Sequence, residues 1–142
     1  MAKVKKSITV NAPIEKVFEY ISETTNLLEI WPSLINVKDM HWTVNGRWFR
    51  WAYKMAGLFF EGTAKDIEYK INDRIVTETE EGLRSTIMWG FEPENGKTKV
   101  TFIVEYQIPV PLLGRLADII IKRINDHEGD LVMANLKVRM EG

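Results

Sequence analysis

The side chains that most often perform acid–base or nucleophilic chemistry are scarce in this sequence. Histidine occurs twice, as His41 and His127, and cysteine does not occur. The lack of cysteine excludes disulfides, thiolate metal sites and a cysteine nucleophile. No serine lies in a nucleophile-elbow motif, and no histidine or carboxylate cluster has metal-ligand spacing. We therefore expect neither a metal nor another cofactor, and the candidates for proton transfer reduce to Tyr53, Tyr106, His127 and Lys65.

Large aromatic side chains, in contrast, are abundant. The sequence has five Trp, four Tyr, six Phe and six Met. Trp and Tyr carry polar tips that need a hydrogen-bond partner when buried, so several of them in one small core are unusual. Flat and flexible side chains also line adaptable ligand pockets. The aromatic residues therefore indicate either an ordinary packed core or the wall of a pocket.

Composition and charge limit the class of protein. The chain has 142 residues, of which 45% are hydrophobic and 27% charged, which suits a single domain over residues 1–142. A net charge of -1 argues against a general nucleic-acid binder. No apolar run approaches the roughly 18 residues of a membrane span, and the N-terminus lacks the apolar segment of a signal peptide. We expect a cytoplasmic protein.

The elements that must position the aromatic residues begin with one strand and two short helices. Residues 3–10 end in an alternation typical of a strand. Residues 14–21 place apolar side chains at i, i+3, i+4 and i+7, which is one face of a helix, and Pro13 suits its first position. A second short helix is expected from about residue 24 to residue 30, and Pro32 ends it.

Residues 37–108 predict six antiparallel strands joined by tight turns. Asn45-Gly46 and Asn95-Gly96 are strong hairpin signals between strand-like runs. Further turns are indicated at Gly57, Asn72-Asp73 and Glu81-Gly82. Residues 58–69 give no clear alternation, because neither set of alternate positions is cleanly apolar.

Residues 113–138 predict a long C-terminal helix, about 39 Å long if unbroken. Gly129 costs roughly 1 kcal/mol inside it and could mark a bend. Its apolar stripe includes Leu113, Leu116, Ile120, Ile124, Leu131 and Val138. A twisted antiparallel sheet must bury one face, and only this helix is long enough to cover it. We predict an α+β fold in which a curved antiparallel sheet of about seven strands wraps around the C-terminal helix.

Three segments resemble one protein family. Residues 7–18, which read SITVNAPIEKVF, are similar to the opening signature of the polyketide cyclase/dehydrase and lipid-transport group of the START-like (SRPBCC, helix-grip) superfamily. Trp31-Pro32-Ser33-Leu34 resembles its tryptophan–proline motif, and residues 96–101, GKTKVT, resemble its penultimate hairpin. The resemblance implies a helix-grip fold over the whole chain. It does not select a function, because the superfamily includes enzymes, lipid carriers, quinone-binding proteins and hormone receptors.

The nearest named relatives in this resemblance are the aromatic-polyketide aromatase/cyclases. The positions that match their Trp, Pro, Leu and pocket-lining Trp are Trp31, Pro32, Leu34 and Trp89. Their pocket tyrosine falls at Lys38 in an ungapped comparison, and their catalytic pocket arginine falls near Ile67. Because these two groups are not evident, the resemblance identifies no catalytic residue.

We predict that a ligand binds between the sheet and the C-terminal helix. The expected ligand-binding residues are Trp31, Leu34, Trp51, Tyr53, Trp89, Phe91, Tyr106, Ile120, Ile124 and His127. For His127, a core histidine with a hydrogen-bond partner is the simpler interpretation, and an acid–base role is the alternative.

Three functions follow from these residues and the resemblance. The first is binding of a small hydrophobic ligand that is aromatic or lipid-like. The second is a polyketide aromatase/cyclase or dehydratase that folds its substrate and assists enolisation with one or two polar groups. The third is a protein-interaction module of the quinone-chaperone or ribosome-associated type, which would use exposed apolar residues near 119–121 or 55–60. We expect a monomer or homodimer without a nucleic-acid partner.

Overall fold

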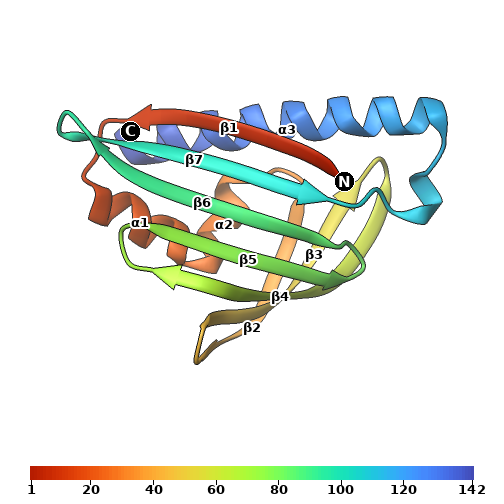
Figure 1. Cartoon of the computed structure of the whole chain (residues 1–142), viewed down its shortest axis with the longest axis horizontal. Helices are drawn as coiled ribbons and strands as arrows, with labels where there is room; N and C mark the ends of the chain where they lie inside the picture. The colour runs from red at the N-terminus through yellow and green to blue at the C-terminus, as the bar shows by residue number, and fades with distance from the viewer.

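The chain forms a seven-stranded antiparallel sheet whose hollow face holds two short helices and whose edge is covered by a long one (Figure 1). The structure, a computed structural model, describes residues 1–114 and 117–142 in full, and the side chains of residues 115 and 116 lie outside this description. The elements are β1 (Ala2–Val10), α1 (Ile14–Ser22), η1 (Thr24–Asn26), α2 (Leu27–Ile30), β2 (Leu34–Thr43), β3 (Gly46–Met55), β4 (Leu58–Lys70), β5 (Arg74–Glu81), β6 (Ser85–Glu94), β7 (Lys97–Tyr106), η2 (Val110–Leu112) and α3 (Arg115–Glu141). The predicted α+β architecture is confirmed.

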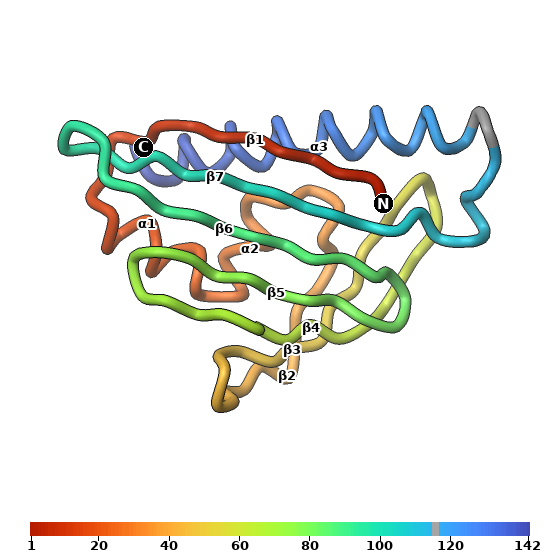
Figure 2. The backbone as a smooth tube through the Cα atoms, in the orientation of Figure 1, coloured from red at the N-terminus to blue at the C-terminus, as the bar shows by residue number. Residues whose placement is uncertain are grey.

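The strands pair in the order β1-β7-β6-β5-β4-β3-β2, all antiparallel. Strands β2 to β7 form a meander whose turns fall where the sequence predicts them, and β1 crosses over to pair with β7 along the edge beside α3. The backbone trace shows that β1 and α3 run side by side and in the same direction (Figure 2). This arrangement brings the first and last elements of the chain together.

The inward face of β4 explains why its sequence shows no clear alternation. That face carries Gly62, Ala64 and Asp66, which are small or charged rather than large and apolar. At Gly62 an added Cβ would lie 2.5 Å from a ring carbon of Trp51, so the glycine makes room for the indole. A bulge between Asp66 and Glu68 then shifts the register with β5.

The predicted inward face of the C-terminal helix is wrong. Ile120 and Ile124 are 55% and 41% exposed, and Leu113, Leu131 and Val138 are exposed as well, whereas Leu116 lies outside the described side chains. The buried face of α3 consists of Ile121, Gly129, Val132, Met133, Leu136 and Met140. The predicted stripe is more continuous in the sequence because the true inward face is interrupted by Asn125, Glu128 and Gly129.

Gly129 marks a close approach rather than a bend. Helix α3 runs unbroken through it, and an added Cβ would lie 2.7 Å from Cγ1 of Val4 in β1. Only glycine lets the helix axis come this close to the strand. This close contact holds α3 directly against β1.

Candidate functional site

A cavity lies between the concave face of the sheet and α3. Its free space is about 120 Å³, close to the roughly 150 Å³ of an engineered apolar cavity that binds benzene. The wall is formed mainly by apolar and aromatic side chains, and Gln107 is the only exposed residue among those that line it in the described part of the chain. The cavity is thus large enough for one small ring.

Six of the ten predicted ligand-binding residues line this cavity. They are Trp31, Leu34, Trp51, Tyr53, Trp89 and Tyr106. The aromatic rings meet edge to face: the ring centroids of Trp31 and Tyr53 are 6.2 Å apart, and those of Trp31 and Phe102 are 5.2 Å apart. Trp89 packs against Phe102 with a centroid distance of 4.5 Å. These contacts form a continuous aromatic wall.

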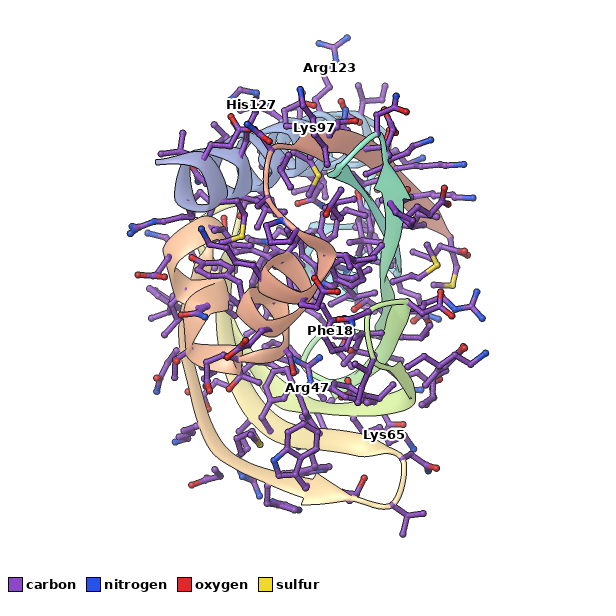
Figure 3. All side chains as sticks on the ribbon, turned by 90° about the vertical axis from the view of Figure 1, so that its left-hand side faces the viewer. Phe18, Arg47, Lys65, Lys97, Arg123 and His127 are labelled. Atoms are coloured by element: carbon purple, nitrogen blue, oxygen red, sulfur yellow. The ribbon has the colours of Figure 1, made fainter. Side chains whose placement is uncertain are left out.

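The other four predicted residues lie elsewhere. Phe91 is buried in the core, where its ring packs 5.3 Å from that of Phe18. Ile120, Ile124 and His127 lie on the exposed surface of α3, and Figure 3 shows His127 beside Arg123 on the outer side of the helix. Because the buried face of α3 differs from the predicted one, these three residues do not line the cavity, and the prediction that they face a ligand there is wrong.

A chain of polar groups crosses one side of the cavity and was not predicted. The indole N–H of Trp31 donates to the Tyr53 hydroxyl at 3.1 Å, and this hydroxyl donates to Oε1 of Glu128 at 3.4 Å. The backbone N–H of Ser33 donates to the same carboxylate oxygen at 2.9 Å. Glu128 therefore ties α3 to β3 and to the turn that follows α2.

The phenol of Tyr53 is held in its neutral form. Burial raises the pKa of Tyr53 above its usual value, and the negative charge of Glu128 raises it further. Burial likewise raises the pKa of Tyr106. Both tyrosines face the cavity, whereas Lys65 is exposed and its Nζ lies 3.8 Å from Oε1 of Glu80. Of the four proton-transfer candidates, only the two tyrosines are placed to touch a ligand.

A buried ion pair closes another part of the wall. Arg47 and Asp66 are each 2% exposed. The guanidinium donates to the carboxylate from Nε at 2.7 Å and from Nη2 at 3.1 Å, and its Nη1 donates to the carbonyl of Ser22 at 2.9 Å. Thr77 donates to the same carboxylate at 2.7 Å. Arg47 thus fastens the end of α1 to the sheet, and it lies in the interior of the fold (Figure 3).

This pair lies close to where the resemblance places the arginine of the aromatase/cyclases. Ile67, the residue at that position by sequence count, is 47% exposed, and its neighbour Asp66 is the residue that faces inward. The guanidinium at this wall comes instead from β3, and it is neutralised by Asp66. The sequence alone does not give the register between β3 and β4, so it does not reveal that Arg47 pairs with Asp66.

The described residues contain no group of three or more His, Asp or Glu side chains placed to hold a metal ion. In the same part of the chain, no helix has both the length and the apolar character needed to cross a membrane. Exposed apolar side chains do occur at the two surfaces named for a protein-interaction role: Ile119 and Ile120 on α3, and Leu58 and Phe59 at the β3–β4 turn. The oligomeric state and a protein partner stay predictions.

The curved sheet, the long C-terminal helix and the cavity between them are the features of the helix-grip fold. A START superfamily protein from Mycobacterium smegmatis has the same fold, with a TM-score of 0.81 at 15% identity over 99% of this chain and 97% of that one. The chain belongs to the polyketide cyclase / dehydrase and lipid transport family, whose family model matches residues 1–141. The resemblance predicted from the sequence is confirmed.

Two further solved structures show how varied the proteins with this fold are. The di-domain aromatase/cyclase StfQ of the steffimycin biosynthetic pathway is similar with a TM-score of 0.76 at 16% identity, over 98% of this chain and 50% of that one. The Aha1 dimer from Colwellia psychrerythraea has a TM-score of 0.66 at 15% identity, over 99% and 97% of the two chains. No curated protein sequence matches the chain. These likenesses show the fold, and the family supports binding of a hydrophobic ligand or a cyclase role.

Proposed function

We propose that this protein binds a small, ring-containing hydrophobic ligand in the cavity between the sheet and α3. The observation that carries the proposal is the aromatic wall around free space of about 120 Å³. In this wall Trp31 meets Tyr53 and Phe102 edge to face, and Trp89 packs against Phe102 at a tilt. Such a wall contacts a flat ring on several sides, which favours an aromatic ligand over an acyl chain. A substrate of several fused rings would require the cavity to widen.

The test is a calorimetric titration of 1,4-dimethylbenzene into the protein and two variants. Val104→Phe fills the cavity, because Val104 lines it. Ile103→Phe is the matched control, because the neighbouring residue on β7 points to the other face of the sheet and does not line the cavity. We expect wild type and I103F to bind and V104F to lose binding, with circular dichroism confirming that both variants are folded. Equal binding by V104F and I103F would contradict a site in the cavity.

A second function, cyclase or dehydratase chemistry, is favoured by the contact between Tyr53 and Glu128. A neutral phenol beside a carboxylate can pass a proton to or from a carbonyl substrate that enters the cavity. This reading predicts that Tyr53→Phe changes the products formed from a poly-β-ketone while leaving binding of 1,4-dimethylbenzene intact. Identical product distributions with and without the wild-type protein would contradict it.

A further inference from the structure

Glu128 is an unusual residue for the cavity it lines. Among the described side chains, the charged residues in the cavity wall are Arg47 and Glu128. Arg47 is already neutralised by Asp66 in a two-point ion pair, so it is not available to balance a second carboxylate. Glu128 therefore brings an unbalanced negative charge to a wall that is mainly apolar and aromatic.

One oxygen of this carboxylate is held and the other is available. Oε1 accepts hydrogen bonds from the Ser33 N–H and from the Tyr53 hydroxyl. No hydrogen bond or ion pair to Oε2 is found in the described part of the chain, and no buried side-chain oxygen or nitrogen there lacks a partner. Oε2 is therefore accessible and not a buried atom without a partner. Because Glu128 lines the cavity, Oε2 is the oxygen left to accept a hydrogen bond from a group that enters it.

The neighbouring polar groups leave the carboxylate as an acceptor. The Trp31 N–H is directed to Tyr53, and the Tyr53 hydroxyl is directed to Glu128. Because the donors of Trp31 and Tyr53 are occupied by the protein, this chain of groups offers a ligand an acceptor at Glu128 and no donor. An ionised carboxylate accepts hydrogen bonds and cannot donate them.

We propose that the cavity selects apolar ring compounds that carry a hydroxyl or amino donor and rejects those that carry a carboxylate, with Oε2 of Glu128 as the acceptor. A donor on the ligand forms a charge-assisted hydrogen bond with this oxygen. A ligand carboxylate would instead place two negative charges together in a largely apolar cavity. This inference rests on the proposed function and specifies the chemical class of its ligand.

A simpler role for Glu128 is to hold the turn after α2 against α3 through the Ser33 N–H. The conservative variant Glu128→Gln separates the two roles, since its side-chain carbonyl can still accept from Ser33 while the charge is lost. A purely structural role predicts that E128Q changes stability but leaves the order of ligand affinities unchanged. Glu105→Gln, at an exposed position of β7, is the matched control for loss of one negative charge.

The experiment is a calorimetric titration with four ligands of the same shape: 4-methylphenol, 4-methylaniline, 1,4-dimethylbenzene and 4-methylbenzoate. For wild type and E105Q we expect the phenol and the aniline to bind about tenfold or more tightly than 1,4-dimethylbenzene, as a hydrogen bond to a charged group allows. The benzoate should bind more weakly than 1,4-dimethylbenzene. In E128Q the advantage of the two donors should shrink to within about threefold, and the benzoate should gain affinity.

The outcomes separate this inference from the proposed function. If wild type binds the phenol, the aniline and 1,4-dimethylbenzene equally, donor selection is wrong and the hydrophobic site stands. If the expected order appears and persists in E128Q, Glu128 is not the acceptor. If none of the four ligands binds, both the inference and the proposed function fail. The wild-type order needs no variant, so the test holds even if E128Q does not fold.

Discussion

Breaking the buried ion pair at the cavity wall should cost more than any change on the outer face of the sheet. In Asp66→Asn, the guanidinium of Arg47 keeps its charge at 2% exposure but loses its counter-charge. The carboxylate accepts four hydrogen bonds, from the N–H, Nε and Nη2 of Arg47 and from Thr77. An amide can accept only at its oxygen, and its NH2 group would face other donors.

The expected loss follows from these contacts. Removing one partner of a buried pair costs about 3–5 kcal/mol, out of a total of about 5–15 kcal/mol for a folded domain. With a urea m value of about 2 kcal/mol per M, the unfolding midpoint should fall by about 2 M. Replacing both residues, as Arg47→Met with Asp66→Leu, should recover part of this loss. The recovery is incomplete because the carbonyl of Ser22 then loses its donor.

Urea unfolding followed by Trp fluorescence measures these changes. Glu68→Gln is the matched control, because Glu68 also accepts two hydrogen bonds from one arginine, Arg74, but on the exposed face. This control should leave the midpoint within experimental error. If D66N lowers the midpoint no more than E68Q does, the buried pair does not hold α1 to the sheet as described.

Two further predictions concern α3 and Tyr53. Gly129→Ala should not raise the melting temperature. Overpacking against Val4 costs about 1–3 kcal/mol, which offsets the gain of about 1 kcal/mol in helix propensity. A higher melting temperature would place Gly129 on the outer face of α3. Tyr53 contributes stability that is complete below the unfolded pKa of about 10 and is lost as the pH rises through its raised folded pKa. The urea midpoint of Tyr53→Phe should therefore fall less than that of wild type between pH 9 and pH 12, and parallel falls would show that Tyr53 ionises as it does in the unfolded chain.

Much of the fold can be predicted from the sequence, because the sequence signals for its turns and strands are local. The Asn-Gly turns, Pro13 and the alternation in β3 and β7 each constrain only a few neighbouring residues, and the structure confirms the strands and turns that they predict. Part of the aromatic wall can also be predicted from the sequence, since Trp51 and Tyr53 share a strand face with Phe49 and Met55. The strand β4 is the exception, because Gly62 and Ala64 keep its inward face small to make room for Trp51.

The polar part of the site depends on contacts between distant residues. Glu128 is 75 positions from Tyr53 in the chain, and a glutamate on a helix normally indicates the solvent side. The next residue is Gly129, because β1 lies so close to α3 there that a side chain would overlap Val4. No local sequence pattern reveals this contact. Together these two residues interrupt the true inward stripe, and that interruption makes the outer stripe with Ile120 and Ile124 look like the buried one.

The most direct test of the central claim is where a bound ring lies. Intermolecular nuclear Overhauser effects from the methyl groups of 1,4-dimethylbenzene should reach Trp31, Trp89 and Phe102, which line the cavity. Contacts confined to Ile120 and Ile124, on the exposed side of α3, would show that the ring binds the surface of the helix and would contradict a ligand site inside the fold.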